Sequence, residues 1–269
     1  MTRRCIIVTV CLSAGFFLIM HLTDPLPQDP AYHDFADKRS LYGIPHFWNV
    51  VTNLPYFLIG VIGCFGIVLQ RPAGILPGVR SNYLIMYLGA LLVGLGSSWY
   101  HLQPANQSLL WDRLPLVITF MAFTSIILGE YINVRTGRYL LGPLLVIGIA
   151  SVIYWYLGEL SGQGDLRPYA IVQFLPMLLL PLIMLQRPCP YESNQWTWWL
   201  MGCYLLAKVF EMYDMEVFTM LEYISGHSLK HLVSAAGLLI LYFGLFRRTL
   251  HKDPTGKNTV TMHPAAADK

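Results

Sequence analysis

The sequence predicts an all-α membrane protein, because of its composition and the length of its apolar runs. Of 269 residues, 55% are hydrophobic and only 12% are charged, and the mean hydropathy is +0.50. Soluble domains carry about 25% charged residues. Eight apolar runs have about the 20 residues that cross a bilayer as a helix, near residues 5–22, 46–69, 81–101, 112–132, 139–158, 168–186, 195–213 and 227–246. We therefore expect a bundle of eight spanning helices.

The first run, residues 5–22, has two interpretations. It follows Arg3 and Arg4, and a basic start before an apolar stretch is typical of a secretory signal peptide. The run is long for that role, and the chain continues His-Leu-Thr-Asp-Pro rather than with a small-x-small cleavage site. These features favour an uncleaved transmembrane helix.

The distribution of basic residues predicts the orientation, although the net charge of +3 is small. If the N-terminus is cytoplasmic and eight spans alternate, most loop Lys and Arg residues fall on the inner side. The acidic residues of the linker 24–39 then fall outside. Because cytoplasmic loops are enriched in Lys and Arg, we expect both termini in the cytoplasm.

A histidine pair marks the start of the last run. The segment Gly226-His-Ser-Leu-Lys-His231 places His227 and His231 at positions i and i+4. On a helix this spacing stacks both imidazoles on one face, about one turn apart. Two neutral imidazoles on one face form half of a metal site. Placing two imidazoles in an apolar membrane segment costs free energy unless the imidazoles have a partner. This cost favours a functional role for the pair.

Three more polar residues fall at the same membrane depth under the predicted topology. Ser97 and His101 are again at i and i+4, and Asp112 opens the next run. Three histidines and a carboxylate match a catalytic zinc site, in which three protein ligands leave a fourth position open. Each residue also has a simpler interpretation. His101 could face headgroup water, Asp112 could cap a helix, and Ser97 could be a small residue at a helix contact.

Other functional classes find little support in the sequence. There is no basic cluster with interleaved aromatic residues, which argues against nucleic-acid binding. The five cysteines show no CxxC spacing and are interpreted as apolar filler. No inverted repeat or matched pair of broken helices indicates a transporter.

Together these motifs resemble those of the alkaline ceramidases. The pattern Ser-x-x-x-His, an Asp eleven residues later and a late His-x-x-x-His is shared with the wider superfamily that includes the adiponectin and progestin receptors. Phe47-Trp-Asn-Val-Val-Thr-Asn53 is similar to a signature of the ceramidase branch, and Gly226–Ala235 resembles its last helix. The resemblance covers roughly residues 34–246. The segment Gly43-Ile-Pro-His-Phe-Trp-Asn is most similar to the corresponding segment of prokaryotic members.

The resemblance implies a seven-transmembrane helix bundle, here with one additional N-terminal transmembrane helix. It implies His101, His227 and His231 as zinc ligands, with Asp112 and Ser97 as the catalytic residues that hold and activate the zinc-bound water. The family cleaves the amide of ceramides to a sphingoid base and a fatty acid. We therefore expect Asp112 to act as general base, and Ser97 to donate a hydrogen bond to the water or to the oxyanion.

The apolar runs, the loop charges and the resemblance together predict a division of the chain and a location. Residues 1–23 form the N-terminal helix, 24–45 an outer linker, 46–246 the catalytic core and 247–269 a disordered cytoplasmic tail. The expected location is the inner membrane of a bacterial cell, with the active site toward the outer leaflet. The expected partner is a membrane lipid substrate.

Calcium is a doubtful second cofactor. Animal family members bind it through an Asp-Trp-x-Glu-x-Asn segment and a Glu just before Phe-Trp-Asn. Here Asp34-Phe-Ala-Asp37 keeps the first part, but Arg39 and His46 stand where the Asn and the Glu are expected. Because two oxygen ligands are lost and a cation is gained, we expect Asp34 or Asp37 to pair with Lys38 or Arg39 instead.

Further polar residues lie in the predicted spans. Asn49 and Asn53 share a helix face, and we expect them to support the metal ligands. Glu211 has two interpretations. It could form an ion pair with Lys208, three residues earlier on the same helix. Alternatively, Glu211 or Asp214 could accept a hydrogen bond from a ligand histidine. Glu130 is expected to reach water at the inner end of its span.

Two functions remain open at this level. One is a zinc-dependent intramembrane amidohydrolase acting on ceramide or a ceramide-like lipid. The other is a receptor or signalling module on the same scaffold with a structural zinc. The absence of a sizeable extramembrane domain in this sequence favours the enzyme.

Overall fold

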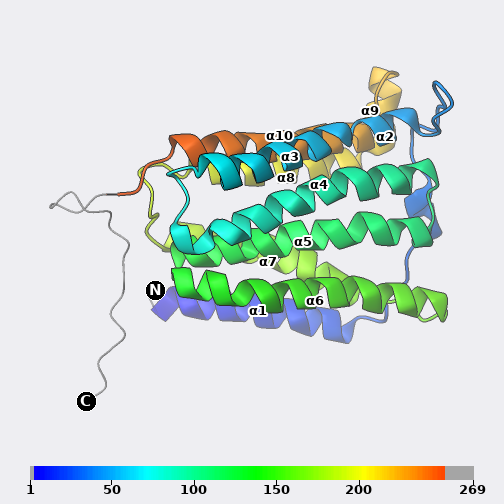
Figure 1. Ribbon diagram of the computed structural model, residues 1–269. Coiled ribbons are helices and arrows are strands. Elements are labelled where there is room, and N and C mark those ends of the chain that lie inside the picture. Colours follow the sequence, from blue (N-terminus) through cyan, green and yellow to red (C-terminus); the bar gives the residue numbers. More distant parts are fainter. Residues whose placement is uncertain (1–2, 252–269) are drawn as a thin grey trace, which may run out of the picture.

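A computed structural model describes residues 3–251, with side chains from residue 11 onward, and its regular elements are helices (Figure 1). In chain order they are α1 (Arg3–Leu22), η1 (Pro30–His33), α2 (Phe47–Val51), α3 (Leu54–Phe65), η2 (Gly66–Gln70), η3 (Pro77–Val79), α4 (Arg80–Leu102), α5 (Asn106–Tyr131), α6 (Val134–Leu160), α7 (Arg167–Gln186), α8 (Gln195–Met212), α9 (Asp214–Leu221) and α10 (Gly226–Arg247). The long helices run roughly alongside one another in a single bundle.

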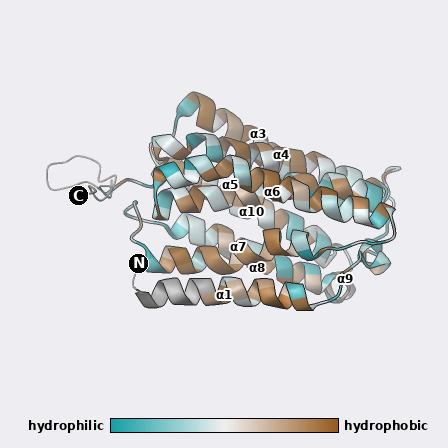
Figure 2. Ribbon diagram, turned by 90° about the horizontal axis from the view of Figure 1, so that it is seen from below, coloured by the Kyte–Doolittle hydropathy of each residue, from teal (hydrophilic) through white to brown (hydrophobic). Residues whose placement is uncertain are grey.

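The chain is a multi-pass integral membrane protein. Six helical segments in the described range are long and apolar enough to cross a membrane. They are Phe47–Gln70, Pro77–Leu102, Asn106–Tyr131, Val134–Leu160, Arg167–Gln186 and Gly226–Arg247. Figure 2 shows hydrophobic residues along these helices, with much of the hydrophilic colour at the two ends of the bundle.

The two remaining predicted spans differ from these six. α1 has 20 residues, and its described side chains, in Cys11–Leu22, form an apolar helix. α8 has 18 residues, but it contains Gln195, Lys208 and Glu211, which lower its hydropathy. Both helices lie alongside the rest of the bundle (Figure 1). The predicted count of eight spans is thus supported for six segments, and the other two stay predictions.

The connections alternate between the two ends of the bundle. α4 packs on α5, α5 on α6 and α8 on α10. The end of α4, the start of α5 and the start of α10 therefore meet at one end, where α2, α9 and the linker after α1 also lie (Figure 1). The sequence motifs that predict a metal site all map to this end.

The opposite end is closed by a buried ion pair. Glu130 of α5 lies 2.7 Å from Arg248, which directly follows α10, and both side chains are 1% exposed. Glu130 also accepts hydrogen bonds from the hydroxyls of Tyr83 (2.8 Å) and Tyr191 (2.7 Å). The prediction that Glu130 reaches water is wrong, because the segment after α10 folds back and covers it.

That segment extends the packed part of the chain past residue 246. Leu250 forms an isolated bridge with Tyr191, and the amide of His251 donates to the carbonyl of Pro190. The expected disordered tail begins within this packed segment, and its residues from 252 on lie outside the described residues. Cys11, Cys64, Cys189 and Cys203 are free, as expected of apolar filler.

Candidate metal centre

Three buried imidazoles converge where α4 and α10 meet. His101 ends the last turn of α4, and His227 and His231 lie one turn apart at the start of α10. Their candidate ligand nitrogens all lie within 4.8 Å of one another. The ring centroids are separated by 4.8 to 5.1 Å. The structure thus brings together the three histidines that the sequence predicts as ligands.

The spacing of the ring nitrogens suits a small tetrahedral cation. The Nε2 atoms of His101 and His227 are 3.2 Å apart. Two imidazole nitrogens bound to one zinc ion at 2.0–2.1 Å in tetrahedral geometry are about 3.3 Å apart. Three neutral nitrogen donors in a buried site also suit zinc better than calcium, which prefers oxygen ligands.

A threonine sets the orientation of one imidazole. The hydroxyl of Thr52 donates to the carbonyl of Trp48 (2.6 Å) and lies 3.0 Å from Nδ1 of His231. Since the hydroxyl proton is used, Nδ1–H of His231 donates to the hydroxyl oxygen, and Nε2 keeps a lone pair for a metal. Sequence reasoning missed Thr52, although it lies within the Phe47–Asn53 motif.

An aromatic ring closes one side of the cluster. Phe35, in the linker after α1, is 3% exposed. Its ring centroid lies 4.7 Å from that of His101 and 4.4 Å from that of His227. The linker therefore shields the imidazoles on this side, and His231 faces a cavity on another.

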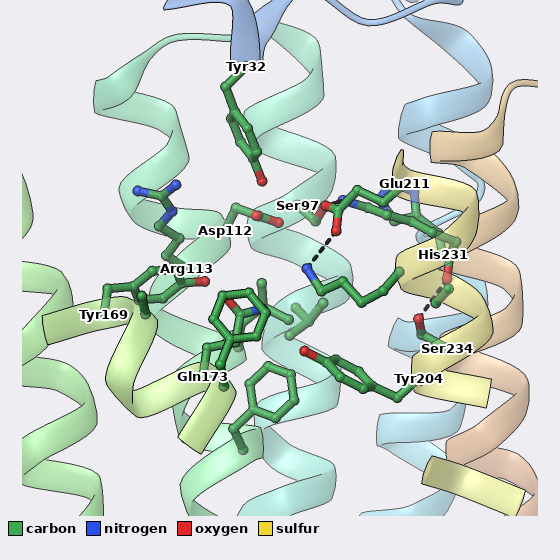
Figure 3. Close-up of a pocket in the computed structure, with 18 of the residues that line it drawn as sticks. Tyr32, Ser97, Asp112, Arg113, Tyr169, Gln173, Tyr204, Glu211, His231 and Ser234 are labelled. Atoms are coloured by element: carbon green, nitrogen blue, oxygen red, sulfur yellow. Dashed lines mark hydrogen bonds and ion pairs between the residues drawn. The ribbon is translucent and has the colours of Figure 1, made fainter. Parts of the chain in front are cut away.

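Ser97 and Asp112 line the same cavity (Figure 3). The side chains of Ser97 and Asp112 lie near each other where α4 and α5 pack together (Figure 3). Gly96 makes this possible, because a Cβ atom there would lie 2.0 Å from the carbonyl oxygen of Trp111. Only glycine allows α4 and α5 to approach this closely beside the site.

The alternative interpretation of Asp112 as a helix cap is wrong. α5 begins at Asn106 with Ala105 as its N-cap, six residues before the predicted start of the span. Asp112 therefore lies in the second turn of α5 and is buried, at 9% exposure. Its side chain is free to face the cavity instead of its own helix end.

The predicted supporting residues contact the backbone and neighbouring hydroxyls rather than the imidazole rings. Asn49 accepts a hydrogen bond from Ser228 (2.6 Å), and the side chain of Asn53 donates to the carbonyl of Asn49 (2.8 Å). Asp214 accepts from the backbone amide of His227 (2.6 Å). These contacts fix the position of α10, and with it the register of the histidine pair.

Glu211 belongs to a three-residue charge cluster. Its carboxylate lies 2.5 Å from Nζ of Lys208 and 2.6 Å from Nζ of Lys230. The ion-pair interpretation of Lys208 and Glu211 is confirmed. Lys230, which lies between the two histidines on α10, is a partner that the sequence analysis did not assign.

The acidic residues of the linker are paired as the sequence predicts. Lys38 pairs with Asp34, and Nη2 of Arg39 lies 2.7 Å from the buried carboxylate of Asp37. Arg39 also donates to the carbonyl oxygens of Glu222 (3.1 Å) and Tyr223 (2.7 Å). The guanidinium of Arg39 thus pairs with Asp37, one of the two acidic residues considered for calcium.

A cavity of about 300 Å³ extends from the imidazole cluster into the bundle. Figure 3 shows Asp112 and Ser97 near its centre, His231 on one side and Arg113 on the other, with Tyr32 above. Gln173 and Tyr204 lie below them in this view. The apolar walls include Leu116, Phe120 and Phe174. The cavity therefore joins a polar centre to an apolar chamber.

Fold and site together define a multi-pass membrane protein with a buried three-histidine centre at one end of its helix bundle. The family model described as Ceramidase matches residues 40–261, which is most of the chain, and the protein belongs to this family. A Dictyostelium discoideum protein named "Putative alkaline ceramidase dcd3A" is 28% identical over 113 residues. That match covers 36% of this chain and 38% of the relative, so it spans less than half of either protein.

Proposed function

We propose that this protein is a zinc-dependent amidohydrolase that cleaves the N-acyl amide of ceramide or a ceramide-like membrane lipid. The observation that carries the proposal is the convergence of His101, His227 and His231 beside a cavity that also holds Asp112 and Ser97. Membership of the Ceramidase family supports the same reaction class.

The three imidazoles would hold the metal through nitrogen atoms, with the cavity side left for water and substrate. Bound zinc supplies Lewis acidity, which makes water a competent nucleophile near neutral pH and polarises a carbonyl group. The buried position and the contact with Phe35 limit the entry of other water molecules. These features agree with a catalytic rather than a fully closed structural site.

Asp112 is proposed to move the proton. Its carboxylate accepts a proton from the attacking water and delivers it to the leaving nitrogen, so that the C–N bond breaks and a neutral amine departs. The proximity of Ser97 to this carboxylate in the cavity supports the assignment (Figure 3). When substrate is present, the hydroxyl of Ser97 is placed to donate to the oxyanion.

The cavity shape suits a lipid. An acyl chain can lie against Leu116, Phe120 and Phe174 while its amide lies beside Asp112. We assign this end of the bundle to the outer leaflet of a bacterial inner membrane, because the basic loop residues gather at the opposite end. N-acyl lipids would then enter from the membrane without leaving it.

The test compares purified wild type, His227→Ala and Asp112→Asn. We expect about one zinc per chain in the wild type and in Asp112→Asn, and little in His227→Ala. Ceramide hydrolysis, followed as released fatty acid, should fall by about 10²–10⁴-fold in Asp112→Asn. Zinc binding without release of fatty acid from any N-acyl lipid would instead favour the receptor function with a structural zinc.

A further inference from the structure

Arg113 is a buried cation whose hydrogen bonds are incomplete. It follows Asp112 on α5, lines the cavity and is 4% exposed. Its Nη2 donates to Oε1 of Gln28 at 2.6 Å, whereas its Nη1 is buried without a hydrogen-bond partner. A buried guanidinium ordinarily uses its planar set of donors on a carboxylate or a phosphate.

No carboxylate of the described part of the chain forms an ion pair with Arg113. The carboxylate of Asp112 is turned toward Ser97 and away from the guanidinium of Arg113 in Figure 3. Glu159 accepts from the backbone amide of Gln28 (2.6 Å) and from the indole of Trp155 (3.1 Å). Neither carboxylate therefore lies within ion-pair distance of Arg113.

The other cations of the cavity have an ion-pair partner, because Lys208 and Lys230 share the carboxylate of Glu211. The positive charge of Arg113 is thus the one in the cavity lining that lacks an ion-pair partner among the described residues. An anion that enters the cavity would find a cation without a counter-charge at this guanidinium.

Aromatic rings keep Arg113 in place without an anion. Its Cζ atom lies 4.1 Å from the ring centroid of Trp155, 4.8 Å from that of Tyr169 and 5.6 Å from that of Tyr32. Such rings stabilise a cation through their electron-rich faces, and they leave the in-plane N–H groups free. The side chain is therefore fixed in position, and the described residues leave the donors of Nη1 unused.

We infer that Arg113 binds an anionic group on the amine part of the substrate, such as the carboxylate of an N-acyl amino acid or a head-group phosphate. This inference rests on the proposed amide hydrolysis and narrows its substrate class. Figure 3 shows Arg113 and His231 on opposite sides of Asp112. An amide beside Asp112 places its acyl carbon toward the imidazoles and its amine substituent toward the guanidinium. A neutral head group offers Nη1 at most a hydrogen-bond acceptor and leaves the charge of Arg113 uncompensated.

The experiment uses two substrates with the same acyl chain, N-palmitoylglycine and N-palmitoylethanolamide, which differ in the charge of a small amine part. The full-length protein in detergent micelles is compared with Arg113→Gln and Arg113→Lys. Arg135→Gln serves as a matched control, because Arg135 is exposed and lies at the other end of the bundle. The readouts are kcat and KM for each substrate, and the thermal stabilisation that N-palmitoylglycine gives.

We expect the wild type and Arg135→Gln to prefer N-palmitoylglycine. Arg113→Gln should lose roughly 10- to 100-fold in kcat/KM on this substrate, mainly through KM, because a charge-assisted hydrogen bond is lost. Its activity on the ethanolamide should stay within about twofold. An equal loss on both substrates, or a wild type without preference for the acid, overturns the inference.

The binding readout separates this inference from the proposed function. If neither amide is cleaved, stabilisation by N-palmitoylglycine that is lost in Arg113→Gln still supports the anion site, and equal stabilisation of both proteins refutes it. Millimolar phosphate that stabilises the wild type as strongly as the lipid would overturn the assignment to a lipid head group. If Arg113→Gln does not fold, Arg113→Lys carries the test, and an unchanged preference for the acid refutes the inference.

Discussion

The buried pair of Glu130 and Arg248 offers a direct test of what holds together the end of the bundle that lies opposite the histidines. Glu130→Gln keeps the size of the side chain but removes the charge opposite a guanidinium that is 1% exposed. Removing one partner of a buried ion pair leaves the other charge uncompensated, which costs about 3–5 kcal/mol. The hydroxyls of Tyr83 and Tyr191 also lose a charged acceptor. We therefore expect a loss near the upper part of this range.

The assay is SDS-induced unfolding of the purified protein in detergent, followed by circular dichroism. Glu192→Gln is the matched control, because Glu192 lies next to Tyr191 at the same end of the bundle and its side chain accepts a hydrogen bond from Thr249 at the exposed surface. That change should alter the free energy of unfolding by less than about 0.5 kcal/mol. Zinc content should be unaffected in both variants, since the histidine cluster lies at the other end of the bundle.

A double variant tests whether the lost stability comes from the buried charge that is left without a partner. Glu130→Leu combined with Arg248→Met removes both charges and should recover much of the stability lost in Glu130→Gln, because no buried charge is left alone. If Glu130→Gln destabilises the protein no more than Glu192→Gln, the ion pair does not close the bundle, and the reasoning above is refuted.

Two further predictions concern a metal ligand and a loop. Thr52→Val removes the hydrogen bond to Nδ1 of His231 and should weaken zinc affinity by about 10- to 100-fold in a competition titration; unchanged affinity would show that Thr52 does not orient the ring. Burial acts to raise the pKa of the Asp165 carboxyl, but hydrogen bonds from Arg167 outweigh it and hold that pKa below its ordinary value. The carboxylate therefore stabilises the fold above the pKa of the unfolded chain, about 3.9, and this contribution is lost as pH falls through the lower pKa of the folded state. Asp165→Asn should lower the melting temperature by the same amount between pH 7 and pH 5, and the difference from wild type should shrink below about pH 4; a difference that grows in acid would contradict the assignment.

Local patterns in the sequence were sufficient to predict the three histidines. A helix repeats every 3.6 residues, so the i,i+4 spacing of His227 and His231 already places both rings on one face. The alternation of spans then places His101 at the same end of the bundle. These predictions need only helix geometry and the direction in which each helix runs, and both follow from the sequence.

The supporting contacts were predicted less well, because they depend on how helices pack. Asp214 was expected to accept a hydrogen bond from a ligand histidine and Asn49 to support the ligands, but Asp214 binds the backbone amide of His227 and Asn49 binds Ser228. Thr52, which does contact a ring, carries no spacing signal that distinguishes it from other threonines. Which of these polar residues contacts a histidine ring depends on differences of a few ångströms in the distances between helices. The spacing of residues along the sequence does not reveal those distances.

The sequence by itself determined that the chain crosses a membrane, which end of the bundle carries the histidines and which acidic residues of the linker are paired. Only the tertiary structure decided that Glu130 is buried with Arg248 and that Arg113 lies among aromatic rings with an unpaired Nη1. Each of these environments is assembled from segments far apart in the chain. A charged residue in an apolar run can be exposed, paired or free to bind a ligand, and the free energy that separates these states comes from neighbours that only the folded chain brings within reach.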